Sequence, residues 1–342
     1  MSDLAVLTGG STPERDVALA GAAQVVRALR SGGHHVAVVD TAAGHLTPAD
    51  EERLLRPAVG KAPPTPRALG ELAAREADID LVRVPDLRSA DLVFIVLHGR
   101  QGEGGEVQAL LDSAGVTYAG SGPLGSGLAM DKDIAKRLFR DAGIPTPAWS
   151  VWPVSASRIA ALGLPLVVKP SKTGSTVGLT VVHDARDIER AVRTALAFDD
   201  EVLLEEFVPG REFTVGVLGD EALAVGEIIP SHDVFDYECK YTPGLTREVF
   251  PADLPVELSD RLRALGRSVH RTLKLRDFSR TDFRVGTDGT PQVLEANTLP
   301  GLTATSLFPQ SAAAVGIAFD ALCERICELA LRRPGARNKV KA

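Results

Sequence analysis

Short apolar runs alternate with amphipathic stretches in the first part of the chain. Residues 4–8 (LAVLT) are expected to form a buried strand, and a Gly turn, a helical run over 13–29 and a second strand at 34–40 follow. Strand, turn, helix and strand in this order predict a right-handed βαβ opening of an α/β sheet. Such sheets bind ligands beyond the carboxyl ends of their strands, so the loop at 9–14 is a candidate binding loop.

The pattern is less informative until residue 91. Residues 41–90 are rich in Ala, Pro and Arg, and we expect loops there with one or two surface helices. Residues 91–115 then predict a buried strand, a Gly-rich turn and an amphipathic helix. His98 falls at the carboxyl edge of this strand, where a lone His is more often structural than functional.

A dinucleotide-binding motif has to be considered at residues 120–125. Gly120, Gly122 and Gly125 match the pattern G-x-G-x-x-G, and Asp141 lies about twenty residues further on. That motif needs its acidic residue at the end of a second strand, whereas Asp141 closes an amphipathic helix. We therefore reject the dinucleotide interpretation.

The second part of the chain continues with alternating elements. A Pro-rich linker at 145–153 precedes a helix near 155–162, a strand at 165–170, a helix at 185–198, a strand at 201–208, a further strand from 211 and a last amphipathic helix at about 315–332. No internal repeat or low-complexity segment interrupts this order.

The loop KPSKTGSTVG, residues 169–178, has the physical character of a phosphate cradle. It is not a Walker A loop, because its Lys precedes the glycines. Gly174 and Gly178 free the backbone to point amide groups inward, and Ser175 and Thr176 add hydroxyls. A flexible hairpin tip is the alternative interpretation.

Residues 278–309 carry the most specific pattern. Two runs of alternating residues flank the Asp-Gly pair at 288–289, which is a strong hairpin signal. If this pair forms a two-residue loop, the residues on either side of it pair with each other. Counting back along both strands then places Asp282 opposite Glu295 and Arg280 opposite Asn297.

Side chains alternate between the two faces of a strand, so this register also predicts two unlike faces. The polar face would carry Arg280, Asp282, Glu295 and Asn297, and the apolar face Phe283, Val285, Leu294 and Ala296. Facing carboxylates repel each other, and a hard divalent cation would relieve that repulsion. We expect Mg²⁺ bound by Asp282, Glu295 and Asn297. A solvated hairpin face with ordinary surface charges is the alternative.

Composition narrows the function. The chain has 342 residues, 44% of them hydrophobic and 24% charged, which is ordinary for a globular protein. A net charge of −7 argues against a broad surface for nucleic acid or for anionic membranes. We find no signal sequence or membrane span, and expect a cytoplasmic protein. Cys239, Cys323 and Cys327 are expected to be structural thiols.

Several segments together resemble the D-alanine-D-alanine ligase family of the ATP-grasp superfamily across nearly the whole chain. They are GGSTPERDVAL (9–19), LHGRQGEGGEVQ (97–108), YAGSGPLGSGLAMDK (118–132), KPSKTGSTVG (169–178), LLEEFVPGREFTVGVLG (203–219), FDYECKY (235–241) and the stretch from RTDF to EANTLPGLTATSLFP (280–309). The motifs MDK, YECKY and NTLPGLT are specific to these ligases.

The resemblance implies a fold and an activity. The fold would be α/β with three ATP-grasp subdomains: an N-terminal Rossmann-like unit at 1–121, a central unit at 122–204 and a C-terminal unit at 205–335, followed by a tail at 336–342. The activity would be ATP-dependent joining of two D-alanines through an acyl phosphate, for peptidoglycan synthesis. ATP and two Mg²⁺ ions, which Mn²⁺ can replace, would be required. A homodimer is also implied.

The resemblance also implies roles for individual residues. Those assigned to catalysis are Glu14, His98, Ser175, Tyr241, Arg280 and Gly301; to acceptor binding, Ser306 and Leu307; to ATP binding, Lys132, Lys169, Glu205, Glu206, Val208, Glu212 and Lys240; and to metal binding, Asp282, Glu295 and Asn297. Segment 232–248 would be a lid, joined to the 169–178 loop through Ser175 and Tyr241. Tyr241 would favour D-alanine over D-lactate as acceptor.

The chain departs from the family pattern at Ala18, near Gly104, at Thr176 and at Ser279, where the family usually has Gly. These departures leave open a sister ligase with another acceptor, such as D-lactate, D-serine or an unusual amino acid. A non-catalytic nucleotide sensor is a further alternative. The complete set of charged residues expected for phosphoryl transfer argues against the sensor.

Overall fold

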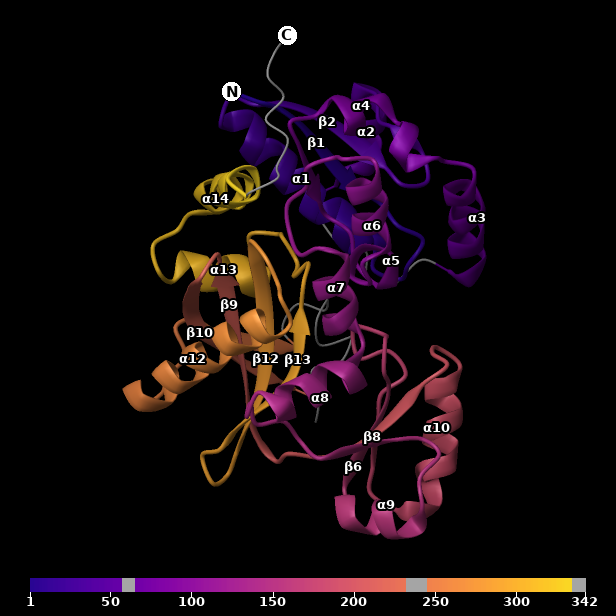
Figure 1. Ribbon diagram of the computed structural model, residues 1–342, viewed down its shortest axis with the longest axis vertical. Helices are drawn as coiled ribbons and strands as arrows, with labels where there is room; N and C mark the ends of the chain where they lie inside the picture. Colours follow the sequence, from indigo (N-terminus) through magenta and orange to yellow (C-terminus); the bar gives the residue numbers. More distant parts are fainter. Residues whose placement is uncertain (57–64, 232–244, 334–342) are drawn as a thin grey trace.

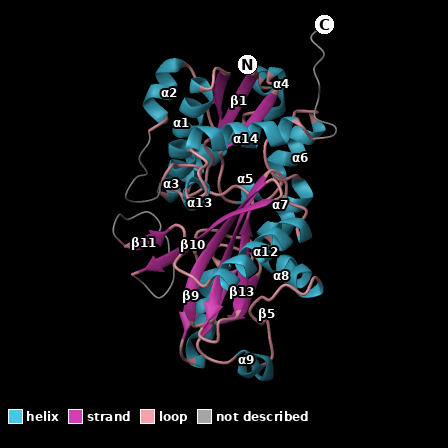
Figure 2. Cartoon of the chain, turned by 90° about the vertical axis from the view of Figure 1, so that its left-hand side faces the viewer, coloured by secondary structure: helices cyan, strands magenta, loops and turns pink. Residues whose placement is uncertain are grey.

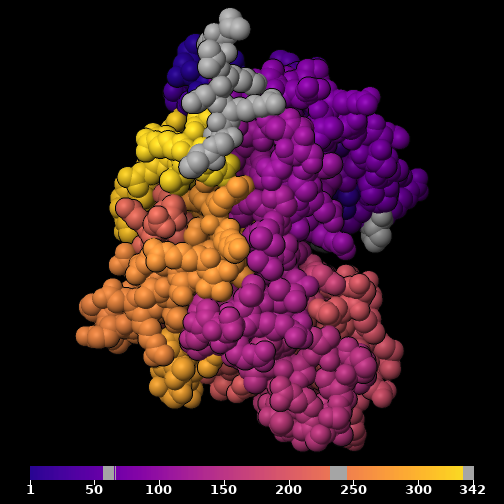
Figure 3. Space-filling model, viewed as in Figure 1, coloured from indigo at the N-terminus to yellow at the C-terminus, as the bar shows by residue number. Residues whose placement is uncertain are grey.

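The computed structural model describes residues 1–56, 65–231 and 245–333, which fold around three β-sheets (Figure 1). The N-terminal sheet and the sheet built by residues 149–206 lie at opposite ends of the molecule, and a five-stranded sheet lies between them (Figures 1 and 2). The space-filling view shows the same order, with residues of the first hundred above and residues 150–200 below (Figure 3). The predicted α/β class is therefore confirmed.

The N-terminal sheet has the order β3-β2-β1-β4. Its parallel strands are β1 (Asp3–Thr8), β2 (His35–Asp40) and β4 (Leu92–Ile95), and β3 (Gly44–His45) pairs antiparallel with β2. Helix α1 (Arg15–Ser31) connects β1 to β2 and buries its apolar residues. The predicted βαβ opening is correct, because α1 returns the chain to a parallel neighbour of β1.

Residues 41–90 are more regular than their composition suggested. They contain α2 (Pro48–Leu54), α3 (Pro66–Ala77), the 3₁₀ turn η1 (Leu81–Arg83) and α4 (Pro85–Ser89). Thr47 and Thr65 cap the first two helices, each directly before a Pro in the first helical turn. Pro is favoured at that position, so prolines that looked like loop signals mark helix starts here.

The five-stranded sheet has the order β11-β10-β9-β12-β13 and is antiparallel throughout. Its strands are β9 (Gly210–Leu218), β10 (Glu221–Pro230), β11 (Thr246–Val249), β12 (Phe278–Gly286) and β13 (Pro291–Asn297). Helices α12 (Val256–Thr272) and α13 (Leu307–Ala313) pack against it. This sheet carries the hairpin predicted at 278–297.

The predicted pairs in that hairpin are correct, but the predicted turn is not. Asp282 lies opposite Glu295 and Arg280 opposite Asn297. The turn pairs Gly286 with Thr290 through the Gly286 N–H, so it is one residue longer than the two-residue loop we expected. A register shift between Asp282 and Phe283 restores the count, since it leaves one extra residue on β13.

That extra residue is Leu294, and it changes one prediction about the two faces. Val293 joins the apolar core with Phe283, Val285 and Ala296, whereas Leu294 lines a cavity on the polar side. Because of the bulge, the consecutive residues Leu294 and Glu295 both point to the polar side of the hairpin, which strict alternation of side chains does not allow.

The third sheet has the order β5-β8-β6-β7. Its strands are β5 (Trp149–Val151), β6 (Leu166–Pro170), β7 (Thr180–Val182) and β8 (Val202–Glu206), and its helices are α9 (Ala156–Leu162), the 3₁₀ turn η2 (Ala185–Asp187) and α10 (Ile188–Leu196). One face of the sheet and α10 enclose a separate apolar core.

Four further helices connect the sheets. They are α5 (Arg100–Glu103), α6 (Glu106–Ser113), α7 (Pro123–Met130) and α8 (Lys132–Asp141). Asp141 ends α8, as predicted, so it does not close a second strand. Gly125 in α7 lies against another backbone, because an added Cβ would be 2.8 Å from the Lys274 carbonyl oxygen.

The last described helix, α14 (Phe319–Leu331), packs against α1 and β4 of the N-terminal sheet. Its apolar residues, including Cys323 and Cys327, belong to the core of that sheet. Both thiols are buried and free, and burial raises the pKa of Cys323 to about 12. These two cysteines are structural, as predicted, and Cys239 lies outside the described residues. No helix in the described ranges is long and apolar enough to cross a membrane.

Candidate active site

Two adjoining cavities lie where the three sheets meet. We call them the large cavity, of about 740 Å³, and the small cavity, of about 120 Å³. Lys132, Gly174 and Glu295 line both of them. The two spaces therefore adjoin at the first residue of α8, the glycine-rich loop and the hairpin.

The small cavity gathers the described residues that were assigned to ATP. Its lining includes Lys132, Lys169, Glu205, Glu206, Val208 and Glu212, together with apolar side chains such as Val167, Val177, Leu179, Phe207 and Leu294. Lys240 lies outside the described residues. An apolar slot with cations at one side suits a flat ring joined to phosphates.

The carboxylate of Glu205 forms ion pairs with two lysines. Its Oε1 lies 2.7 Å from Lys169 Nζ, and its Oε2 lies 2.8 Å from Lys136 Nζ. Burial alone would raise the pKa of Glu205, but the two ammonium groups lower it, and the net direction is downward. The carboxylate is thus fixed by two lysines, and it orients Lys169 at the cavity wall.

Lys136 was not among the predicted site residues. It is fully buried, and it also donates to Thr146 Oγ1 at 2.6 Å. Burial lowers its pKa to about 8, against the pull of Glu205. Lys136 stands one helical turn after Lys132 on α8, and that spacing was the only signal in the sequence that could have linked it to the site.

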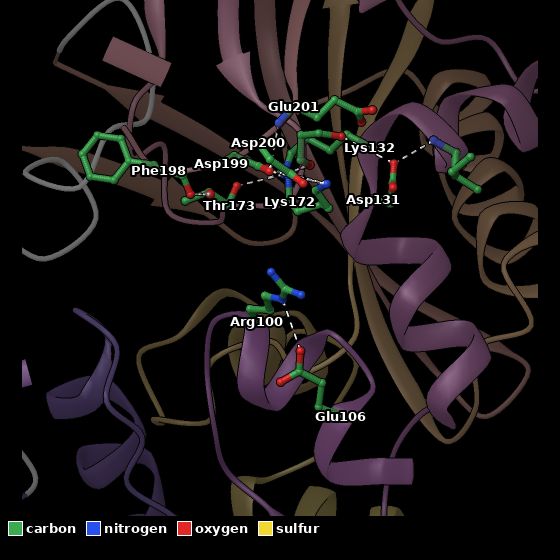
Figure 4. Close-up of polar contacts among 12 residues, drawn as sticks. Arg100, Glu106, Asp131, Lys132, Lys172, Thr173, Phe198, Asp199, Asp200 and Glu201 are labelled. Carbon is green, nitrogen blue, oxygen red and sulfur yellow. Dashed lines mark hydrogen bonds and ion pairs between the residues drawn. The ribbon is translucent and has the colours of Figure 1, made fainter. Parts of the chain in front are cut away.

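The glycine-rich loop is anchored at its base. Lys132 Nζ donates to the Thr173 carbonyl at 3.0 Å, and Lys172 Nζ lies 2.6 Å from Asp200 Oδ1 (Figure 4). Thr173 Oγ1 donates to the Phe198 carbonyl at 3.3 Å. The tip differs from the base, because Ser175 and Thr176 both have positive φ angles, 53° and 61°. Non-glycine residues in this conformation are strained, which is common at functional loops.

The polar face of the hairpin forms a charged network. Arg280 binds Asp282 through two contacts, Nε to Oδ1 at 2.9 Å and Nη2 to Oδ2 at 2.8 Å. Thr214 Oγ1 donates to Asp282 Oδ1 at 2.7 Å, and Lys132 Nζ lies 3.2 Å from Glu295 Oε2. Burial would lower the pKa of Arg280, but Asp282 raises it above its ordinary value. Each carboxylate therefore has a cation beside it.

Asn297 completes this face. With its amide oriented to satisfy both neighbours, it donates to Glu103 Oε1 at 2.7 Å and accepts from Arg280 Nη2 at 2.7 Å. In the described ranges no group of three His, Cys, Asp or Glu side chains gathers as a metal site. The hairpin instead offers two cross-strand carboxylates and one amide oxygen. Such an all-oxygen set fits Mg²⁺, which takes its remaining ligands from water and phosphates.

Glu103 was also missed. It is buried on α5, accepts from the Gly99 N–H at 2.9 Å and contacts Asn297 as above. Burial, and then the nearby Glu14 carboxylate, raise the pKa of Glu103 to about 8. Glu103 lies in the segment 97–108 that resembles the family, and that motif was the signal in the sequence that could have linked it to the site.

The large cavity brings together the described residues assigned to catalysis. Glu14, His98, Ser175, Arg280 and Gly301 line it. Ser175 Oγ donates to Glu14 Oε1, so the glycine-rich loop reaches the start of α1. Tyr241 and most of the predicted lid at 232–248 lie outside the described residues.

His98 has the environment of a ligand-binding residue. Burial lowers its pKa and outweighs the nearby Glu14 carboxylate, so the ring is neutral. Its Nε2 is buried and has no hydrogen-bond partner among the residues that the structure describes. A buried, unsatisfied ring nitrogen is costly unless a ligand binds it, which favours the functional interpretation of His98.

The far end of the large cavity is built by the segment before α13. Ser306 Oγ lies 2.8 Å from Thr303 Oγ1, and a Cβ at Gly301 would be 2.9 Å from Ser306 Oγ. Leu307 is the first residue of α13. Gln310 and Glu248, neither of them predicted, contact each other on the same wall.

Three β-sheets with helices packed on them, and a small cavity beside a larger one at their junction, have the arrangement of the ATP-grasp class of enzymes. Solved structures support this assignment. D-alanine–D-alanine ligase from Bacillus anthracis has 30% identity and a TM-score of 0.75, and the match covers 97% of this chain and 98% of that one. A second structure of the Bacillus anthracis enzyme, complexed with ATP, has 29% identity, the same TM-score and the same coverage.

The sequence identifies the family within that class. The model described as "D-ala D-ala ligase N-terminus" matches residues 3–121, and "D-ala D-ala ligase C-terminus" matches residues 138–328. The D-alanine–D-alanine ligase of Synechococcus sp. (strain JA-2-3B'a(2-13)) is 40% identical over 337 residues, 97% of this chain and 94% of that relative. The ligase of Gloeobacter violaceus is 40% identical over 338 residues, 96% and 99% of the two chains. The chain belongs to the D-alanine–D-alanine ligase family.

Proposed function

We propose that this protein joins two D-alanine molecules to D-alanyl-D-alanine, with ATP converted to ADP and phosphate, as a step of peptidoglycan precursor synthesis. The observation that carries the proposal is the 40% identity to curated ligases over nearly the full chain. The carboxylate of the first D-alanine attacks the γ-phosphorus of ATP and ADP leaves. The amine of the second D-alanine then attacks the acyl phosphate, and phosphate leaves.

The small cavity is the proposed nucleotide site. Its apolar wall would receive the adenine ring, while Lys132 and Lys169 would neutralise the phosphates at the junction with the large cavity. Glu205 is a proposed ligand of adenine and ribose, and its carboxylate also lies beside Lys136 and Lys169. Glu206, Val208 and Glu212 remain candidates for adenine and ribose.

Asp282, Glu295 and Asn297 are the proposed holders of two Mg²⁺ ions, for which Mn²⁺ could substitute. Bound there, the ions would supply charge neutralisation to the transferring phosphoryl group. Arg280 lies on the same face and would stabilise that group directly, since its charge is fixed by Asp282. Lys240 is proposed to reach the same phosphate from outside the described residues.

The large cavity is the proposed site of both amino acids. Glu14 would bind the ammonium of the first D-alanine, and neutral His98 would orient its carboxylate. The Gly301 N–H and Arg280 would stabilise the oxyanion of the tetrahedral intermediate. Ser306 and the Leu307 N–H, at the start of α13, would bind the carboxylate of the second D-alanine.

Four further parts of the proposal concern the domains, a lid, the oligomeric state and the location of the protein. The chain would divide at residues 121 and 204 into three ATP-grasp subdomains, with the last ending at 335. The 232–248 segment would close over the site as a lid with Ser175 and Tyr241. The protein would form a homodimer, and it would act in the cytoplasm.

D-serine is a second candidate for the acceptor. The VanG D-Ala:D-Ser ligase of Enterococcus faecalis has a TM-score of 0.78 and 28% identity, covering 95% of this chain and 98% of that one. This TM-score is at least as high as the 0.75 of the D-alanine–D-alanine ligase structures, so the fold does not separate these acceptors. Tyr241 and the residues around Ser306 and Gln310 are the proposed determinants of that choice.

One assay tests the proposal. The protein is incubated with ATP, Mg²⁺ and D-alanine, alone and with equal D-serine or D-lactate, and the products are identified by mass spectrometry. We expect D-alanyl-D-alanine and ADP in equal amounts, and D-alanyl-D-alanine as the main product of every mixture. ADP release without any dipeptide, or a mixed product in place of D-alanyl-D-alanine, would contradict the proposed acceptor.

A further inference from the structure

The acceptor end of the large cavity carries a carboxylate that the proposed reaction has not yet used. Glu248 stands on β11 opposite Ile228 of β10, and its side chain is partly buried at the cavity wall. Gln310 Nε2 donates to Glu248 Oε2 and, at 2.7 Å, to the Thr305 carbonyl. Glu248 is therefore tied, through one amide, to the segment that holds Ser306.

The position of Gln310 fixes where this carboxylate stands. Gln310 lies one turn after Ser306, and its N–H donates to the Ser306 carbonyl at 3.0 Å. Ser306 and Gly301 lie close together, as the distance for an added Cβ at Gly301 shows. Glu248 thus lines the same pocket end as the groups proposed for the acceptor carboxylate and for the oxyanion.

The negative charge of Glu248 suits this position for binding a cation. Glu248 lines the same cavity as Arg280 and interacts with it electrostatically, and burial raises the pKa of Glu248. A carboxylate that loses hydration keeps its charge at lower cost when a cation binds beside it. The second amino acid brings such a cation, because its α-ammonium must lie between its own carboxylate, near Ser306, and the reacting carbonyl, near Arg280 and Gly301.

We propose that Glu248 is a specificity-determining residue, whose carboxylate binds the ammonium of the second substrate and takes one proton from it before attack. The proposal rests on the ligase function proposed above and deepens it. The acceptor class that fits is a zwitterionic D-amino acid. A 2-hydroxy acid is disfavoured, because it offers no cation to Glu248 and carries a net negative charge towards it.

The proposed reaction step is balanced in protons and in electron pairs. One proton passes from the acceptor ammonium to Glu248, which leaves a neutral amine and a neutral carboxyl group, and Glu248 releases that proton to water after product leaves. The amine lone pair forms the C–N bond to the acyl carbonyl carbon, and the bond from that carbon to the phosphate oxygen breaks. The second amine proton leaves with phosphate, which departs as hydrogen phosphate.

The variant Glu248→Gln separates charge from packing, because an amide can keep the hydrogen bond to Gln310 while losing the negative charge. The exposed Glu221→Gln, at the start of β10, is the matched control. Steady-state kinetics with D-alanine give separate KM values for the first and second substrate. A charge-assisted hydrogen bond supports about a 10-fold to 100-fold rise in KM for the second D-alanine in Glu248→Gln. The KM values for ATP and for the first D-alanine should stay within about twofold, as should all values for Glu221→Gln.

A competition between equal D-alanine and D-lactate gives an independent measurement. We expect the ratio of amide to ester product to fall by about 10-fold or more in Glu248→Gln, since only the amine depends on the carboxylate. An unchanged KM for the second D-alanine, together with an unchanged product ratio, would overturn the proposal.

Two further results keep the outcomes distinct. If the unmodified protein forms no dipeptide, the ligase function itself fails; if it does and Glu248→Gln behaves like Glu221→Gln, only the role of Glu248 fails. Circular dichroism checks the fold of each variant. Should Glu248→Gln not fold, Gln310→Met replaces it, because this change frees the carboxylate from its tether. Gln310→Met should raise the KM for the second D-alanine about threefold to 10-fold, and no rise would overturn the proposal.

Discussion

His270 and Ser279 form a buried pair on the side of the five-stranded sheet that faces α12. His270 Nδ1 lies 2.7 Å from Ser279 Oγ, and both side chains are buried. Ser279 is one of the residues at which the chain was expected to depart from the family pattern, and it supplies a partner for the ring. Burial lowers the pKa of His270 to about 4, which keeps the ring neutral in the folded protein.

This pair predicts a pH-dependent stability. The unfolded ring takes up a proton below a pH of about 6.5, whereas the folded ring does so only below about 4, so stability is lost as pH falls through that window. As the pH falls from 6.5 to 4, the free energy of unfolding should drop by about 1–3 kcal/mol less in His270→Gln than in the unmodified protein. Urea unfolding at several pH values measures the difference. The exposed His35→Gln should follow the unmodified protein; equal slopes for all three would contradict the role of His270.

Glu295 is the residue on which the metal assignment depends most. Glu295→Gln keeps the shape of the side chain but removes the charge that faces Asp282. Phosphoryl transfer should fall at least about 100-fold, which corresponds to roughly 3 kcal/mol of lost transition-state stabilisation. ADP release at ordinary Mg²⁺ measures it, with the exposed Glu257→Gln on α12 as control. Near-normal ADP release with a stably folded variant would show that the ions bind elsewhere.

Helix α7 shows how a short element depends on close approach. A Cβ at Gly125 would lie 2.8 and 3.1 Å from the carbonyl oxygens of Lys274 and Leu273, and backbone cannot move aside cheaply. At Gly127, on the same helix, the nearest atom would be 3.5 Å away, which is an ordinary contact. Close packing against residues 273–274 therefore requires a glycine at position 125, whereas position 127 has room for a side chain.

Alanine substitutions at these two positions should act in opposite directions. Gly125→Ala is expected to lower the free energy of unfolding by about 1–3 kcal/mol, because α7 must shift. Gly127→Ala is expected to raise it by up to about 1 kcal/mol, because Ala favours the helix. Denaturant unfolding of both variants checks this, and a stable Gly125→Ala would mean that α7 is not held against residues 273–274.

At the scale of elements, the sequence predicted the main strands and helices that carry a clear hydrophobic period. It also predicted the cross-strand pair of Asp282 and Glu295, although a longer turn and a bulge at Leu294 had to compensate each other. Bulges follow from packing against neighbouring strands, which alternation in one segment does not record. One or two surface helices were expected within residues 41–90, but their bounds at 48–54 and 66–77 were not, because the prolines that start both helices also fit loops.

At the scale of the whole molecule, the site residues that were missed share one property. Lys136, Glu103 and Glu248 gain their meaning from partners far away in the sequence, namely Glu205, Asn297 and Gln310. Motif spacing detects only residues near each other along the chain. The resemblance to a known family supplied distant residues that its motifs include. Lys136 and Glu248 lie outside those motifs, whereas Glu103 lies inside the segment 97–108, for which the resemblance implied a role only for His98.

The proposed nucleotide cavity lies between the five-stranded sheet and the sheet of residues 149–206, so nucleotide binding is predicted to stabilise the folded protein. ATP with Mg²⁺ at about 100 times its Kd should add about 2.7 kcal/mol, or several degrees in Tm. Lys169→Met should reduce this ATP-induced shift, because one phosphate partner is lost, whereas the exposed Arg190→Met on α10 should not. Thermal unfolding with and without ATP gives the values. The same shift in all three proteins would exclude Lys169 as a phosphate ligand.

Helix α14 has a consequence for how the protein is made. It supplies Leu322, Ile326 and Ala330 to the core of the sheet that contains the first strand of the chain. Chains generally fold from the N-terminus while the ribosome is still adding residues. Here the first sheet emerges early, yet the helix that covers its apolar residues is synthesised some three hundred residues later. Until then that surface is open to chaperones and to aggregation, and a nascent chain stalled before residue 319 cannot complete the core that it began.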